Sequence, residues 1–308
     1  MTLKMDNILL VLIFVSTACV VKAQQEVMFT QYMHNEVTIN PAYAGSHDVV
    51  SATALYRHQW AGIEGAPKTL SFNGHTPLRN EKIGVGLSLI RDQIGVTDNT
   101  HFYASGSYRI KISETMKLQL GLQAGGTSTS ADLTSLQIDD PDDPYFNKNT
   151  GATSSPNFGG GIHLENDKFY FGFSVPQLLT NKLEVAGEKL LEQTRHYFLT
   201  TGYVFDINDR WKAKPSLFVK ASAAAPIEVD ITANAILDDR YWFGLAYRTG
   251  DAASLLLMYQ ATEQFRVGYA YDFPIKSDIR EQSSGSHEIV LNYRFAFSKN
   301  KVLTPRYF

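Results

Sequence analysis

The sequence has almost no cysteine, little charge and no long apolar run. Cys19 is the one cysteine in 308 residues, which excludes an intramolecular disulfide and a cysteine-based metal site. Charged residues make up 19% of the chain and the formal net charge is −3, so a nucleic-acid partner is not expected. After residue 23 no run of about eighteen or more apolar residues occurs, so the sequence predicts no membrane-spanning helix.

The first residues have the pattern of an export signal. Lys4 supplies a short basic region, residues 8–15 are apolar, and Val21-Lys22-Ala23 fits a cleavage site with small residues. We therefore expect residues 1–23 to be a signal peptide, cleaved near Ala23. The alternative is a lipoprotein signal in which Cys19 is acylated, although Ser16 is a poor substitute for the leucine usual at that position.

The stretch 286–297 alternates between an aromatic-aliphatic face and a mostly polar one. Successive side chains of a strand point to opposite faces. One face carries Ile289, Leu291, Tyr293, Phe295 and Phe297, and the other carries Glu288, Asn292 and Arg294. Residues 265–273 repeat this pattern. Charges opposite an aromatic face predict a hydrated interior and a lipid-facing exterior, which is typical of a transmembrane β-barrel.

About fourteen alternating segments can be placed between residues 49 and 297. The predicted fold is therefore all-β, a transmembrane antiparallel barrel of about 14 strands spanning residues 49–298, with long loops at 132–155 and 176–193 and a tail at 299–308. The alternative is a soluble two-sheet sandwich, whose exposed face should not carry bands of Tyr and Phe.

Residues 24–48 show no alternation and contain turn signals such as Asn40-Pro41. Their aromatic side chains need burial, so the stretch is predicted to plug or anchor the barrel; the alternative is a poorly ordered lead-in. The candidate plug or partner-binding residues are Phe29, Gln31, Tyr32, Asn40, Pro41, Tyr43 and Gly45. The candidate exterior-loop residues are Asp139, Asp140, Asp142, Asp143 and Tyr145.

No pattern predicts an active site, a cofactor site or a metal site. The acidic cluster lacks the EF-hand spacing and glycine, which favours a solvated loop over a calcium site. The eight histidines are scattered singly, and no two have the helical spacing of a zinc motif. Charged residues recur at inward positions, either as ion pairs in a hydrated lumen or as a lining that holds a protein segment; the list is Arg109, Lys111, Lys117, Lys212, Lys214, Lys220, Glu228, Asp230, Arg248, Arg266, Asp272, Glu288 and Arg294.

Two stretches resemble one protein family. Gln31-Tyr32-Met33, Asn35 and residues 40–45 (NPAYAG) are similar to the opening signature of the PorP/SprF family, and residues 56–60 (YRHQW) with Ala66-Pro67 are similar to its first strand and turn. The resemblance covers the whole mature chain. Tyr293, Phe295 and Phe297 resemble the C-terminal aromatic signal of outer-membrane barrels, although residues 298–308 extend beyond it.

The resemblance implies a non-enzymatic outer-membrane component of the type IX secretion system of Bacteroidetes. Such proteins help to export or retain cargo, often gliding or surface adhesins. The expected partners are a cargo C-terminal domain, the periplasmic ring and lipoprotein components, and outer-membrane lipid. The alternatives are a passive or solute-specific channel and a structural partner of the secretion ring.

Overall fold

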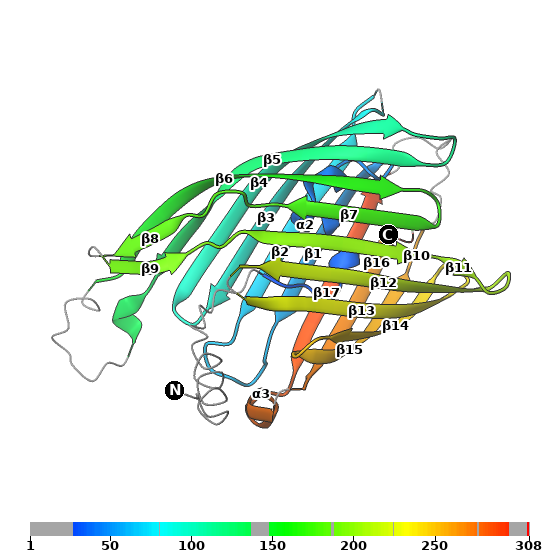
Figure 1. Cartoon of the computed structure of the whole chain (residues 1–308). Coiled ribbons are helices and arrows are strands. Elements are labelled where there is room, and N and C mark those ends of the chain that lie inside the picture. The colour runs from blue at the N-terminus through cyan, green and yellow to red at the C-terminus, as the bar shows by residue number, and fades with distance from the viewer. Residues whose placement is uncertain are drawn as a thin grey trace, which may run out of the picture.

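The computed structural model describes residues 27–79, 81–136, 148–185, 188–223, 225–275, 277–295 and 307, of which 182–192 and 277–278 are described by their backbone alone. Most of these residues form one antiparallel barrel (Figure 1). Its strands are β1 (Val50–His58), β2 (Lys68–Pro77), β3 (Ile83–Ile94), β4 (Thr97–Lys111), β5 (Lys117–Ala131), β6 (Thr150–Glu165), β7 (Phe169–Val175), β10 (His196–Tyr203), β11 (Phe205–Asp206), β12 (Trp211–Ser222), β13 (Ala225–Leu237), β14 (Tyr241–Arg248), β15 (Ala252–Gln260), β16 (Phe265–Pro274) and β17 (Ser286–Phe295).

The barrel closes in two places. The first and last strands of the chain, β1 and β17, pair from Val50↔Phe295 to His58↔His287. The pairing of β10 with β12 joins the two ends of the sheet. β10 and β11 follow one another in the chain and both pair with β12, so together they occupy one strand position. The fifteen strands of the sheet therefore fill fourteen positions around the barrel. The predicted fourteen-stranded barrel is confirmed.

Connection lengths orient the barrel. Short turns such as 166–168 and 238–240 lie at the end where β1 begins and β17 ends, whereas the long connections 132–149, 176–195 and 275–285 lie at the other end. Outer-membrane barrels have short periplasmic turns and longer extracellular loops. We therefore assign the first end to the periplasm and the second to the cell exterior.

The alternation predicted from the sequence appears as alternating burial. In β14, Tyr241, Phe243, Leu245 and Tyr247 are all exposed on the outer face. Leu245, the most exposed of them at 67%, lies between the two tyrosines, which stand near opposite ends of the strand. Tyrosines near both ends of the strand, with the fully apolar Phe243 and Leu245 between them, match the two interfacial girdles of a membrane barrel. Among the described residues no helix is both long and apolar enough to cross a bilayer.

Two boundary predictions were wrong. Residues 150–155, expected in a loop, begin β6, where Thr127↔Ser155 and Thr129↔Thr153 pair across to β5; these residues are polar because the strands extend past the membrane. The expected loop 176–193 contains a separate two-stranded hairpin, β8 (Lys182–Val185) with β9 (Glu188–Glu192). A short helix, α3 (Ser277–Gln282), precedes β17.

Lys111 also departs from its predicted inward position. It ends β4, its side chain is 62% exposed, and it pairs with Glu114 in the periplasmic turn. Alternation beyond the end of a strand no longer places a side chain in the lumen. The predicted signal 1–23, including Cys19, lies outside the described residues, as does the tail 299–308 apart from Tyr307.

A charge placed on the outer face should destabilise the barrel according to its depth. Leu245→Arg puts a cation midway along β14 and is expected to cost about 2–4 kcal/mol of unfolding free energy, whereas Ile207→Arg, in an exposed periplasmic turn, should cost about 0–1 kcal/mol. Urea unfolding in lipid vesicles, followed by tryptophan fluorescence, measures both. Equal costs would contradict the lipid-facing assignment.

Candidate functional site in the barrel lumen

Residues 27–48, here called the lumenal segment, fold as three short helical turns inside the barrel (Figure 1). These are η1 (Tyr32–His34), α2 (Glu36–Ile39) and η2 (Pro41–Tyr43). Asn40 ends α2 and caps η2, because its side-chain oxygen accepts from Ala42 N at 3.0 Å. Proline then stands at the first position of η2, where its fixed φ suits a helix start and no amide donor is lost.

The lumenal segment runs lengthwise through the barrel. Thr30 contacts Asp272 and Glu288, which lie near the extracellular ends of β16 and β17. At the other end, the carbonyl of Gly45 accepts a hydrogen bond from Arg109, which lies near the periplasmic end of β4. One pass of the chain therefore crosses the lumen from the extracellular side to the periplasmic side before β1 begins.

A buried ionic cluster holds the extracellular part of the segment. The amides of Thr30 and Gln31 donate to the two carboxylate oxygens of Glu288 at 2.8 and 2.7 Å. The Thr30 hydroxyl donates to Asp272 at 2.8 Å. Arg57 binds both carboxylates, at 2.7 Å to Asp272 and 3.3 Å to Glu288. All three charged side chains are at most 3% exposed.

The two carboxylates of this cluster are paired and hydrogen-bonded. Buried charges are tolerated only when they are paired and hydrogen-bonded. Here one guanidinium faces two carboxylates, and the lumenal segment supplies three of the donors that those carboxylates accept. Removing the segment would leave two acids facing one arginine. The segment thus supplies hydrogen-bond donors that the buried carboxylates of the wall need.

Hydrogen bonds to backbone groups hold the periplasmic part. Ser174 of β7 donates to the carbonyl of Ile39 at 2.8 Å, and Ser107 of β4 donates to that of Ala44 at 2.6 Å. The Asn40 amide donates to the carbonyl of Ile162 in β6 at 2.9 Å. Two of these three hydrogen bonds are accepted by backbone carbonyls of the segment. They fix the position of its backbone and do not depend on the side chains of Ile39 and Ala44.

Two wall glycines allow this close approach. A Cβ atom at Gly121 of β5 would stand 2.1 Å from Ala42 N, and one at Gly84 of β3 would stand 2.0 Å from Ala44 O. Real Cβ atoms do not come so close to backbone atoms. The barrel wall is therefore shaped to receive the NPAYAG stretch at backbone contact.

Aromatic packing fills the space between these anchors. Tyr32 is fully buried and stacks on Phe218 of β12 with 4.7 Å between ring centroids. Phe29 and Met33 join the same cluster with Trp242 and Met258. Tyr43 lies edge-on to His163 at 5.1 Å and contacts His75 at 5.5 Å. Apolar side chains of the segment thus pack against apolar side chains of the wall inside the lumen.

A second ionic cluster lies on β12–β14, and β14 is separated from β16 of the first cluster by β15 alone. Arg248 donates to Asp230 at 2.9–3.0 Å and lies 3.4 Å from Glu228, which also pairs with Lys220 at 3.4 Å. These residues were predicted to face inward, and the structure confirms that placement. In both clusters each charged side chain lies within 4 Å of one of opposite sign.

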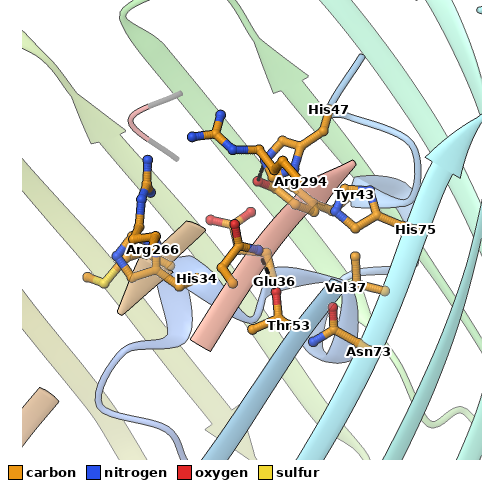
Figure 2. Close-up of a pocket in the computed structure, with 12 residues that line it drawn as sticks. His34, Glu36, Val37, Tyr43, His47, Thr53, Asn73, His75, Arg266 and Arg294 are labelled. Atoms are coloured by element: carbon orange, nitrogen blue, oxygen red, sulfur yellow. Dashed lines mark hydrogen bonds between the residues drawn. The ribbon is translucent and has the colours of Figure 1, made fainter. Parts of the chain in front are cut away.

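One polar cavity beside the segment is very small. It has a volume of about 20 Å³, room for roughly one water molecule. Figure 2 shows Glu36 of α2 in this cavity, with Arg266 and Arg294 from the wall near it. Glu36 is 2% exposed and lies 3.9 Å from His163. Its carboxylate oxygens have no hydrogen bond among the described residues, and a water is the group that fits.

The two cavities beside the segment, of about 20 and 10 Å³, are too small for a bound substrate. No group of three or more metal-ligating side chains comes together among the described residues either. The chemistry that the site can perform is the tight holding of a polypeptide segment by hydrogen bonds, ion pairs and aromatic stacking.

All seven predicted plug residues lie in the lumen and are buried; they are Phe29, Gln31, Tyr32, Asn40, Pro41, Tyr43 and Gly45. The candidate residues did not include Thr30 and Arg57, which both contact Glu288. Arg57 occupies an inward position by simple alternation, and that signal could have identified it. The exterior-loop residues Asp139, Asp140, Asp142, Asp143 and Tyr145 lie outside the described residues.

Breaking the Arg57 cluster should destabilise the whole barrel. Arg57→Met leaves Asp272 and Glu288 buried without their cation, and we expect a loss of about 3–5 kcal/mol of unfolding free energy. Arg91→Met, which breaks the exposed pair with Asp98, is the matched control and should cause little change. A stability of the Arg57 variant equal to that of the control, measured by urea unfolding, would contradict this role.

A methyl group at Gly121 should push against the lumenal segment. Gly121→Ala is expected to cost about 1–3 kcal/mol through overpacking. Gly106→Ala in the neighbouring strand β4 is the control, because its Cβ would meet nothing within 4 Å. Thermal unfolding in detergent compares the two, and an unchanged midpoint for Gly121→Ala would show that Ala42 does not lie against this wall.

The chain is similar to solved outer-membrane proteins of low sequence identity. The CymD monoaromatic hydrocarbon channel matches with a TM-score of 0.50 and 12% identity over 84% of this chain and 92% of that one. A Pseudomonas aeruginosa FadL homologue matches with a TM-score of 0.49 and 14% identity over 84% and 94%. Acinetobacter baumannii Omp33 matches with a TM-score of 0.47 and 10% identity over 82% and 100%.

At such identities the CymD match supports the barrel fold alone. No curated protein sequence matches the chain significantly. The model of one family, described as type IX secretion system membrane protein PorP/SprF, matches residues 21–293. This range covers the lumenal segment and nearly all of the barrel, and the chain therefore belongs to the PorP/SprF family of type IX secretion system membrane proteins.

Proposed function

We propose that this protein is a closed, non-enzymatic outer-membrane barrel that binds a type IX cargo protein through the cargo's C-terminal domain and helps to export or anchor it. The observation that carries the proposal is the filled lumen. Solute passage needs a continuous aqueous path, but in this barrel the lumenal segment is fixed at both ends and packed between them. Membership of the family supplies the link to secretion.

A closed barrel leaves its extracellular rim as the binding surface for cargo. The hairpin β8–β9 forms a sheet of its own and pairs with no barrel strand, and Figure 1 shows it projecting beyond the barrel wall. Outer edges of such a hairpin carry backbone groups that can accept another strand. We propose this hairpin, together with the connection 132–149, as the surface that meets the cargo domain.

The likeness to channels is the reason to weigh a second function. Some structures with this fold are channels by name, and an open pore would make this protein a solute channel. The lumenal segment argues against that function. A structural role in the periplasmic ring is the third possibility, and it predicts a different pattern of export defects.

Deleting the gene should separate these functions. Loss of one or a few proteins from the cell surface or the medium, measured by quantitative mass spectrometry, is expected for a cargo-dedicated barrel. Loss of all type IX products would indicate a ring component, and unchanged export would contradict a role in secretion.

Replacing the β8–β9 hairpin by a short Gly-Ser linker should reduce recovery of cargo with the tagged, detergent-extracted barrel. Arg210→Gln, which breaks an exposed ion pair with Asp238 in the periplasmic turns, is the control and should leave recovery unchanged. Equal recovery from the two variants would exclude the hairpin as the cargo surface.

A further inference from the structure

A groove on the outer face of the barrel lies beside α3, at the extracellular rim. Its volume is about 580 Å³. One part of its lining is apolar and consists of Ala253, Tyr271, Phe273, Pro274 and Ile275; the other part is polar and consists of Arg280, Ser283, Ser284 and Gly285. The groove therefore changes from apolar to polar along the direction from the membrane to the exterior.

The apolar part continues the lipid-facing belt. Tyr271 and Phe273 stand at outward positions near the extracellular end of β16, with 4.4 Å between their ring centroids. Phe273 is 53% exposed. Aromatic side chains at this height mark the boundary between hydrocarbon and headgroups. A lipid chain is therefore the natural neighbour of this wall.

The polar part is built on a fixed backbone. The carbonyl of Ala61, in the β1–β2 connection, accepts from Ser284 N at 2.8 Å, and Ala61 N donates to Gly285 O at 2.7 Å. The Tyr271 hydroxyl donates to the carbonyl of Ser284. Gly285 has φ +94°, and a Cβ atom there would stand 2.5 Å from the Tyr271 hydroxyl. The 283–285 turn is thus held against the aromatic wall.

Arg280 brings a positive charge to this rim. Its side chain is exposed and has no hydrogen bond or ion pair among the described residues. A guanidinium is suited to phosphate, which it binds through paired N–H donors. An anionic headgroup beside Arg280 and an acyl chain along Phe273 would satisfy both parts of the groove at once.

We propose that this groove binds a phosphorylated lipid of the outer leaflet whose headgroup carries a net negative charge, with its phosphate at Arg280 and an acyl chain against Tyr271, Phe273 and Ile275. The site is separate from the proposed cargo surface, because none of its lining residues belongs to the β8–β9 hairpin or to the connection 132–149. Its lipid would tie α3 and the 275–285 connection to the membrane surface.

Lipid A is the probe, and the full-length barrel in nonionic detergent is the sample. Lipid A should raise the unfolding temperature of the wild-type protein, and native mass spectrometry should detect it bound. Arg280→Gln is expected to weaken binding about fivefold. Ala253→Phe, which fills the apolar part and leaves Arg280 intact, should weaken it as well.

Arg240→Gln is the matched control. Arg240 stands at the periplasmic rim, with its guanidinium 5.9 Å from the centre of the Tyr259 ring, and its loss should leave lipid A binding at the wild-type level. Equal binding by the Arg280 and Arg240 variants would overturn the proposal. So would equal binding of zwitterionic phosphatidylcholine, or the full effect from inorganic phosphate without lipid.

Discussion

The carboxylate of Glu288 accepts hydrogen bonds from two successive backbone amides of the lumenal segment and faces the buried guanidinium of Arg57. Because this site is buried, a carboxylate without partners would lower the free energy of unfolding. The segment and the wall therefore stabilise one another. The barrel closes through β1–β17, the same pair of strands that carries Arg57 and Glu288. Closure of the barrel and seating of the segment are therefore coupled in the same place.

The fold was largely predictable from the sequence because a membrane barrel imposes a period of two on nearly every strand. In β14 and β17 the lipid-facing and lumen-facing residues follow that period without exception. Predictions failed where the constraint ends. At residues 150–155 the strands extend past the membrane. The threonines and serines there still pair as a strand, but they lack the alternation of polar and apolar residues by which the other strands were predicted. Lys111 fails at the opposite rim for the same reason.

The candidate site was only partly predictable. The aromatic residues and the Asn40-Pro41 turn of the lumenal segment indicated burial, but the partners of a segment that crosses a lumen come from many strands, and no local pattern links them. Thr30 and Glu288 are 258 positions apart. Gly84 and Gly121 matter because of the backbone that lies against them, which a strand pattern cannot show. The family resemblance indicated secretion. The filled lumen supports the proposal that the barrel is closed and is not a solute channel.

The central claim is that the lumenal segment closes the pore, and conductance of the purified protein in a planar bilayer tests it most directly. The full-length barrel is predicted to give no open-channel steps. A barrel in which residues 29–46 are replaced by a Gly-Ser linker, and which still folds as judged by heat-modifiable mobility on gels, is predicted to conduct ions. Steady conductance of the full-length protein, equal to that of the replaced form, would contradict the account and indicate a channel.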